Sequence, residues 1–195
     1  LCAAPFTPVD LAKAAQHLAA LDTADKEKRD QRKTKNDLEE YLLLLQRFLA
    51  DAPRVARFAR PEELPALQTA LHSAEEWFDT KADDDDDGGN APVLQTEFEA
   101  QLTVLRGLGD PILLRESEAE ARPHAVALLR HAIVLARADI AAMVRKHSNV
   151  ERFAGQLAKH CDTAEGWLSS ALAAQASRAL NEPPAFLTDE VDAQI

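Results

Sequence analysis

The sequence predicts an all-α fold, an antiparallel bundle of five or six helices, on two observations. Of its 195 residues only six are glycine, and much of the rest is Ala, Leu, Glu, Lys, Arg and Gln, which lose little side-chain freedom in a helix. Apolar residues recur three or four positions apart, and no stretch sustains the alternation of a half-buried strand. Because 46% of the residues are hydrophobic, the chain can bury a core.

The first helix is expected to begin at Thr7-Pro8-Val9-Asp10. Thr7 can cap it, Pro8 suits the first helical position, and Asp10 favours the positive helix end. A more polar stretch then leads into a strongly amphipathic segment that Asp51-Ala52-Pro53 ends, and the two segments form one helix or two. The apolar residues are Leu11, Ala14, Ala15, Leu18 and Leu21 in the first segment, and Leu38, Tyr41, Leu42, Leu45, Phe48 and Leu49 in the second.

The next helix is predicted to start at Arg60-Pro61-Glu62-Glu63, where a proline again precedes acids. Residues 82–91 follow it and contain five consecutive aspartates and two glycines, so we expect a disordered surface loop there. The aspartates lack the alternating ligand pattern and closing Glu of a calcium loop, which argues against a metal. The apolar face of the helix is formed by Leu64, Leu67, Leu71, Ala74, Trp77 and Phe78.

Prolines are expected to divide the following region into two helices. Pro92 opens the first, and Asp110-Pro111 breaks or kinks it. The second begins after Arg122-Pro123. The inward residues are Leu94, Phe98, Leu102, Leu105 and Leu108 in the first helix, and Val126, Leu129, Ile133, Ile140 and Met143 or Val144 in the second.

Ser148 and Glu151 form a predicted capping box at the start of the next helix. Its apolar face comprises Val150, Phe153, Leu157, Cys161, Ala164, Trp167, Leu168 and Leu172. Glu182-Pro183-Pro184 ends the regular structure, and Thr188–Val191 can begin one last short helix. Across all helices, the residues predicted to form the structural core are Leu38, Tyr41, Leu45, Leu71, Trp77, Phe98, Leu157 and Trp167.

The charge distribution bears on binding partners. The formal net charge of −11 argues against general nucleic-acid binding. Residues 26–35 depart from this balance with six bases and two acids. They form either a solvated helix face with mixed pairs or a docking stripe for an acidic protein surface. The candidate docking residues are Lys28, Arg29, Arg32, Lys33 and Lys35.

The sequence predicts no enzyme, cofactor or metal site. It lacks a glycine-rich phosphate loop, a nucleophile elbow and the His-Glu pair of zinc proteases. His124 and His131 do not form a convergent ligand set, and neither do His160 and Cys161. Cys161 is interpreted as a small hydrophobe. No apolar run approaches the roughly 20 residues of a membrane-spanning helix.

Four short motifs, in order along the chain, resemble the lid of heat-shock-seventy-type chaperones. Lys35–Tyr41 is similar to the lid signature Lys-Asn-x-Leu-Glu-x-Tyr, and Glu27–Asp30 resembles the charged turn before it. Glu75–Asp79 resembles the Trp-hydrophobe-Asp end of the next lid helix. Glu97–Ile112 is similar to the following helix, which typically ends in Asn-Pro-Ile.

Beyond these motifs, the chain continues with two long helices where an ordinary member turns into a flexible tail. Trp167, Ala173-Ala174-Gln175 and Glu182-Pro183-Pro184 resemble the far end of the large, divergent members, with the 170-kilodalton glucose-regulated (hypoxia up-regulated) branch as the best match. The resemblance implies lid-like helices over residues 1–118 and a C-terminal helical extension over 119–195, packed on or continuing the bundle.

The resemblance implies a non-catalytic C-terminal fragment of a chaperone, consistent with a chain that starts at Leu1 without an initiator Met. The family's ATPase and client-binding β-sandwich would lie upstream. The expected partners are unfolded clients and the ATPase domain of a heat-shock-seventy partner, for which such members act as nucleotide-exchange factors. The expected compartment is the endoplasmic reticulum lumen, with the cytoplasm as the alternative because the retention tetrapeptide is absent.

Two other functions stay open on composition alone. One is a helical scaffold or adaptor whose apolar stripes bind partner helices. The other is a lipid-binding bundle, which the acidic charge disfavours because membrane-surface helices usually carry Lys and Arg on the polar face. The expectation is therefore a protein that binds neither nucleic acid nor membrane.

Overall fold

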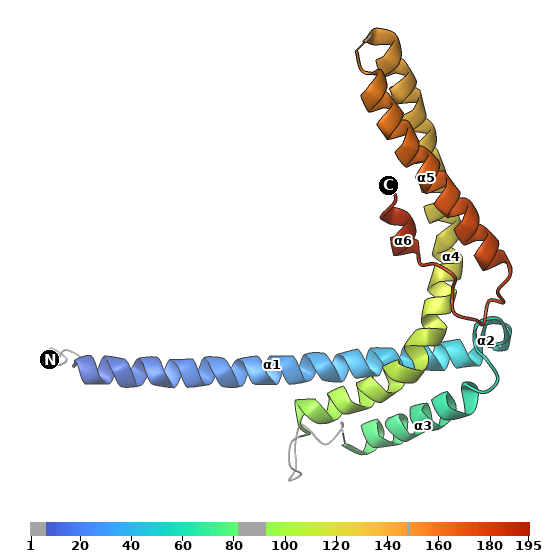
Figure 1. Cartoon of the computed structure of the whole chain (residues 1–195). Helices are drawn as coiled ribbons and strands as arrows, with labels where there is room; N and C mark the ends of the chain where they lie inside the picture. The colour runs from blue at the N-terminus through green and yellow to red at the C-terminus, as the bar shows by residue number, and fades with distance from the viewer. Residues whose placement is uncertain (1–6, 82–92, 148) are drawn as a thin grey trace. The chain divides into compact units, whose positions relative to one another are not determined.

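The computed structural model describes residues 7–81, 93–147 and 149–195 and confirms the all-α class (Figure 1). Within these ranges there are six helices and no strands. The predicted acidic loop at 82–91, the predicted helix start at Pro92 and the predicted cap Ser148 lie outside the described residues. The helices are α1 (Pro8–Ala50), α2 (Ala52–Phe58), α3 (Leu64–Lys81), α4 (Gln95–Lys146), α5 (Glu151–Ala176) and α6 (Thr188–Asp192).

The chain divides into two compact units. The first comprises Leu1–Ala50 and Ala66–Gly107, and so contains α1, most of α3 and the start of α4. The second comprises Asp51–Pro65 and Leu108–Ile195, with α2, the rest of α4, α5 and α6. The division at 118/119 that the resemblance implies separates lid-like helices from a C-terminal extension, and it stays a prediction.

The start of α1 is capped as expected from Thr7 and Asp10. The Thr7 hydroxyl accepts from the Asp10 backbone N–H at 3.2 Å, and the Asp10 carboxylate accepts from the Thr7 hydroxyl at 2.6 Å and from its N–H at 3.0 Å. These hydrogen bonds favour the charged carboxylate and hold the pKa of Asp10 below its ordinary value. α1 then runs unbroken to Ala50, so the two predicted segments form one helix.

The two halves of α1 differ in burial. Every residue from 7 to 30 is exposed, including Leu11 and Leu18 at 59% and 61%, so the apolar stripe expected there does not pack in this structure. Among the described residues of the first unit none covers that stripe, and periodicity alone does not provide a partner. The buried residues of α1 all come later, namely Thr34, Leu38, Tyr41, Leu42, Leu45 and Phe48.

The core of the first unit lies among α1, α3 and the start of α4. In Figure 1, α3 runs antiparallel to α1. The rings of Trp77 and Phe98 meet edge to face, with centroids 5.4 Å apart. Gln46 Nε2 donates to Glu75 Oε1 at 2.7 Å and so links α1 to α3. The buried residues contributed by α3 and the start of α4 are Leu67, Leu71, Ala74, Phe98, Leu102 and Leu105.

Contrary to the prediction of two helices, α4 is a single helix of 52 residues that contains Pro111 and Pro123. A proline inside a helix removes one hydrogen bond and costs about 3 kcal/mol or more. Buried side chains flank both prolines, with Leu105 and Ile112 around the first and Val126 and Leu129 after the second. Their packing offsets that cost, which local sequence rules do not include.

Two helix starts also differ from the sequence prediction. α3 begins at Leu64, after a turn over residues 61–63, rather than at Pro61. α5 begins at Glu151 with Val150 as its N-cap and no side-chain capping bond. Glu151 is therefore the first helical residue, whereas the predicted capping box would place it one turn inside the helix.

The core of the second unit is a hydrophobic cluster shared by α4, α5 and the segment around α6. Trp167 packs edge to face on Phe186, with ring centroids 5.9 Å apart. The short helix predicted near Thr188 is present as α6. The buried members of the cluster are Ala125, Val126, Leu129, Ile133, Cys161, Ala164, Leu168, Phe186 and Val191.

The residues that the sequence predicts as structural core fall into two groups. Those that are buried are Leu38, Tyr41, Leu45, Leu71 and Phe98, and those that are only partly buried are Trp77, Leu157 and Trp167. Phe153, placed on the inward face of α5 by its spacing, is 55% exposed. Near the start of α5 the observed inward face therefore begins at the neighbouring Ala154, which is 4% exposed.

Candidate functional site

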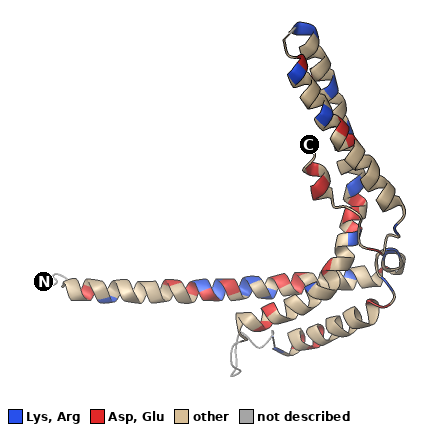
Figure 2. Cartoon of the chain, viewed as in Figure 1, with Lys and Arg blue, Asp and Glu red and all other residues tan. Residues whose placement is uncertain are grey.

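The predicted basic docking stripe lies on α1. Lys28, Arg29, Arg32 and Lys33 are exposed, and Lys35 is partly buried. Figure 2 shows Lys and Arg residues interleaved with Asp and Glu residues along the middle of this helix. The five cations precede the first deeply buried residue of α1, Leu38, so the stripe sits where the helix enters the core.

Helix geometry sorts the five cations into two rows. Lys28, Arg32 and Lys35 are spaced i, i+4 and i+7, so they share one face, and Arg29 and Lys33 form a second row beside it. The first row borders the core, because Lys35 Nζ lies 5.9 Å from the centre of the Phe78 ring. In the second row, Arg29 Nε donates to the Asp25 carbonyl at 3.1 Å. The structure thus groups these residues on one helix surface, and their docking role stays a prediction.

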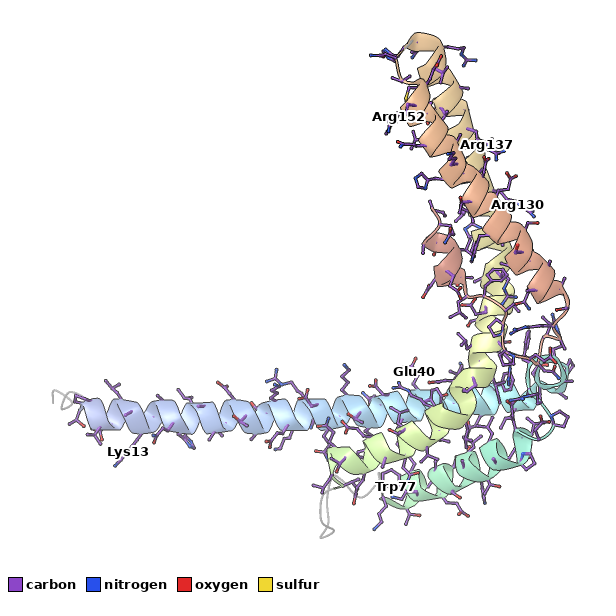
Figure 3. The ribbon with its side chains drawn as sticks, in the orientation of Figure 1. Lys13, Glu40, Trp77, Arg130, Arg137 and Arg152 are labelled. Carbon is purple, nitrogen blue, oxygen red and sulfur yellow. The ribbon has the colours of Figure 1, made fainter. Side chains whose placement is uncertain are left out.

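The lid-like signature Lys35–Tyr41 contributes mainly to packing. Leu38 is fully buried, and the Arg106 guanidinium lies 5.7 Å from the centre of the Tyr41 ring. The outward residues of the signature, with the leucines after it, line a surface hollow of about 430 Å³ on α1. Glu40, which is labelled in Figure 3, is one of these outward residues. The lining residues are Asn36, Glu39, Glu40, Leu43, Leu44 and Arg47.

Exposed apolar side chains gather on the second unit along α4. Leu128, Val134 and Leu135 are 46%, 64% and 51% exposed. Leu128 and Leu135 are seven residues apart and therefore share a face. Arg130 and Arg137 lie on the same helix (Figure 3), and Arg137 Nη2 donates to Asp162 at 2.8 Å and to Glu165 at 2.6 Å on α5.

A mainly apolar groove of about 340 Å³ opens between α4 and α5, and we call it the α4–α5 groove. Its wall also carries Asp139, His160 and Cys161. The apolar lining consists of Leu129, Ala132, Ile133, Ala136, Ile140, Met143, Leu157, Cys161, Ala164 and Ile195.

Sequence reasoning missed an ion-pair network in the second unit. Glu63 accepts from the Arg60 backbone N–H at 2.9 Å and from Arg60 Nη2 at 2.7 Å, and it also pairs with Arg115, whose side chain is 3% exposed. A second pair joins Arg54 to Glu116. Glu63 belongs to the Pro61-Glu62-Glu63 pattern that predicts a helix start. Its partner Arg115 lies 52 residues away, and a contact over that separation leaves no local sequence pattern.

The network determines the charge state of Glu63. Burial by itself would raise the pKa of this carboxyl group, but the hydrogen bonds from Arg115 and Arg60 oppose burial and lower the pKa to about 2. Glu63 is therefore a carboxylate at neutral pH. Its position among structural arginines indicates a role in stability rather than in acid–base chemistry.

The described ranges contain neither a metal-ligand cluster nor a membrane-spanning helix. No three His, Cys, Asp or Glu side chains there are placed to hold a metal ion. None of the helices over the described residues has an apolar stretch long enough to cross a membrane.

Comparison with known proteins identifies relatives of the chain. It is 35% identical over 127 residues to heat shock 70 kDa protein 17 of Arabidopsis thaliana, which covers 65% of the chain and 14% of that protein. It is 24% identical to heat shock protein 88 of Dictyostelium discoideum and 25% identical to the 97 kDa heat shock protein of Mesocentrotus franciscanus. Those two matches cover 91% of the chain and 21% and 19% of the relatives.

No protein-family model matches the chain, and no solved structure matches it significantly. The chain spans about a fifth or less of the length of the curated relatives it matches. All three relatives, from three organisms, are heat shock proteins, as the resemblance of the ordered motifs predicts. The relatives that the chain matches are Hsp70-related large heat shock proteins, and the chain is similar to a part of each.

Proposed function

We propose that the chain is the C-terminal helical part of a large Hsp70-related chaperone, of the 170-kilodalton glucose-regulated branch. One observation carries the proposal: the relatives match 65–91% of this chain but only 14–21% of their own length. Such a part would hold unfolded clients and dock to an Hsp70-type partner as a nucleotide-exchange co-chaperone. The ATPase chemistry would belong to domains upstream, and the compartment would be the endoplasmic reticulum lumen or, alternatively, the cytoplasm.

Client holding is supported by the apolar surface of the second unit. Leu128 and Leu135 are about half exposed and share one face of α4, and the α4–α5 groove lies on the same unit. Contiguous exposed apolar surface is uncommon on monomeric soluble proteins and marks interaction sites. An unfolded polypeptide exposes the apolar side chains that such a surface would contact.

Partner docking is supported by the two cationic rows of α1. Their charge is opposite to that of the chain as a whole, which is −11. Basic residues grouped on an acidic molecule orient it during encounter with a partner surface of opposite sign. The partner face would therefore be acidic, and the complex would be sensitive to salt.

The experiment that tests client holding uses reduced, carboxymethylated α-lactalbumin, a permanently unfolded polypeptide, labelled for fluorescence anisotropy. The variant Leu128→Gln/Leu135→Gln removes two exposed apolar side chains from the proposed surface and should weaken binding. The matched control Leu18→Gln/Leu21→Gln changes two leucines on α1 that are 61% and 48% exposed, and it should bind like the parent chain.

The outcomes separate the alternatives. Equal weakening by both double variants would contradict a client surface on the second unit. A chain that binds no unfolded polypeptide but does bind a folded helical partner would support the scaffold or adaptor function instead.

A further inference from the structure

The last segment of the chain folds back on the second unit. After α5 ends at Ala176, residues 177–195, which we call the C-terminal strap, return along α4 and α5 and finish with α6 (Figure 1). Two of its side chains enter the hydrophobic cluster. Phe186 is 3% exposed and Val191 is fully buried. All other residues of the strap are exposed or only partly buried, so these two side chains attach it.

The polar attachment of the strap is concentrated on one carboxylate. Glu118 on α4, 8% exposed, accepts from the Thr188 backbone N–H at 2.8 Å and from the Thr188 hydroxyl at 3.0 Å. Near the end of α5, Gln175 Oε1 accepts from the Ala185 N–H at 2.8 Å. The Arg122 guanidinium lies 5.3 Å from the centre of the Phe186 ring. The strap is therefore held by a few discrete contacts, which is typical of segments that open locally.

The open groove continues the surface that the strap covers. Leu129, Ile133, Cys161 and Ala164 belong to the cluster that buries Phe186 and Val191, and the same four residues line the α4–α5 groove. Ile195, 65% exposed, follows α6 and lines the groove as well. The strap thus occupies one part of a single apolar seam between α4 and α5, and the rest of that seam is open.

We propose that the C-terminal strap is an intramolecular competitor for the α4–α5 seam, and that the seam's other occupant is an apolar segment of an unfolded polypeptide. This inference rests on the proposed client-holding function and adds its regulation. The strap itself shows what the seam accepts: an aromatic and a β-branched side chain five residues apart, Phe186 and Val191, with carboxylates at Asp189, Glu190 and Asp192 beside them. Met143 in the open part provides an adaptable wall, as flexible methionines do at promiscuous binding surfaces.

Competition of this kind has a quantitative consequence. If clients bind only when the strap is open, their apparent dissociation constant equals the intrinsic constant divided by the open fraction. A strap that is open less than about a tenth of the time therefore weakens client binding at least about tenfold. Substitutions that release the strap should tighten client binding by up to the same factor.

The test compares two single-charge changes on α6 in the full chain. Val191→Asp places a carboxylate at a fully buried position and should expel α6 from the cluster. Asp192→Asn changes the charge of its exposed neighbour and should leave the strap in place. Thr188→Val provides a milder second release, because it removes only the hydroxyl that donates to Glu118. Hydrogen exchange at the Ala185 and Thr188 amides reports strap opening independently of any client.

The client probe is again labelled carboxymethylated α-lactalbumin. We expect Val191→Asp and Thr188→Val to speed exchange at both amides and to tighten client binding, with the larger effect for Val191→Asp, and Asp192→Asn to change neither. A synthetic peptide of residues 182–195 should displace the client from Val191→Asp. The same peptide with Phe186→Ser and Val191→Ser should not.

The result that overturns the strap inference alone is client binding of unchanged affinity in variants whose strap amides exchange faster. Unchanged exchange in Val191→Asp would also overturn it, because the strap would then not be a separable segment. A chain that binds no client in any form would overturn the proposed function and this inference together.

Discussion

Glu63 receives two parallel hydrogen bonds from Arg115, from Nη1 to Oε1 at 3.1 Å and from Nη2 to Oε2 at 2.5 Å. The pair joins the turn before α3 to the middle of α4 within the second unit. The Arg115 side chain is 3% exposed and that of Glu63 is 19% exposed. Both partners are thus largely removed from water, and each compensates the charge of the other.

Glu63→Gln should destabilise the second unit strongly. The substitution leaves the buried Arg115 guanidinium without its counter-charge, and breaking a buried pair in this way costs roughly 3 kcal/mol or more. Urea unfolding followed by tryptophan fluorescence measures the loss. Glu62→Gln is the matched control, because its side chain is 69% exposed and its contact with Arg60 is 3.8 Å long, and surface pairs contribute about 0–1 kcal/mol. Equal losses in both variants would contradict the importance of the Arg115 contact.

Stability should fall at acidic pH through Glu63. Its pKa is about 2 in the folded chain against an ordinary value of 4.5, so the unfolded chain takes up a proton first as the pH falls. The stabilisation is therefore complete above about pH 4.5 and is lost between that value and about pH 2. The measurement is the stability difference between the parent chain and Glu63→Gln across this range. A difference that stays constant down to pH 2 would refute the assignment.

The two halves of α1 should respond differently to leucine truncation. Leu45→Ala removes a fully buried side chain and should cost about 2–5 kcal/mol. Leu18→Ala changes a side chain that is 61% exposed and should alter stability by less than about 0.5 kcal/mol. Urea unfolding compares the variants, and hydrogen exchange should be faster across residues 12–30 than across residues 38–48. A large cost at Leu18 would mean that its stripe packs in solution.

Truncation of Leu71 and of Leu157 should cost different amounts of stability, although their spacing in the sequence predicts both as core residues. Leu71 is 6% exposed, and Leu71→Ala should cost about 2–5 kcal/mol. Leu157 is partly buried at the wall of the α4–α5 groove, so Leu157→Ala should cost closer to about 1 kcal/mol, because the open groove already reduces its contacts. Thermal unfolding of the two variants decides, and a larger loss at Leu157 would contradict the observed burial.

Reversal of the basic stripe should slow partner docking. We expect Arg29→Glu/Arg32→Glu/Lys33→Glu to reduce the association rate with an Hsp70-type ATPase domain more than it raises the dissociation rate, since peripheral charges mainly steer encounter. The effect should shrink as salt screens charges beyond a Debye length of about 8–10 Å. Stopped-flow fluorescence at low and physiological salt provides both rates.

The matched control for that experiment is Arg145→Glu/Lys146→Glu/Arg152→Glu. It changes the net charge by the same amount at three exposed cations of the second unit. If docking depends on the α1 stripe, this variant should associate nearly as fast as the parent chain. Unchanged kinetics in the α1 variant at low salt, or equal slowing in both, would refute a docking role for the stripe.

The helical class, the capped start of α1 at Thr7, its end before Asp51 and the short helix at Thr188 are all predictable from the sequence alone. These features depend on interactions between residues a few positions apart, so propensity, periodicity and capping report them directly. The same holds for the inward face Leu38–Phe48, whose spacing and burial agree. The ordered lid-like motifs likewise placed the chain among its relatives.

Which apolar faces are buried, and which residues distant in the sequence contact each other, is set by the tertiary structure. The stripe Leu11–Leu21 has the same spacing as Leu38–Phe48 but is exposed, because periodicity describes one helix and not its neighbours. Pro111 and Pro123 lie inside α4 because packing around them outweighs their local preference. Glu63 meets Arg115 and Thr188 meets Glu118 across 52 and 70 residues, and contacts over such separations leave no trace in the local pattern.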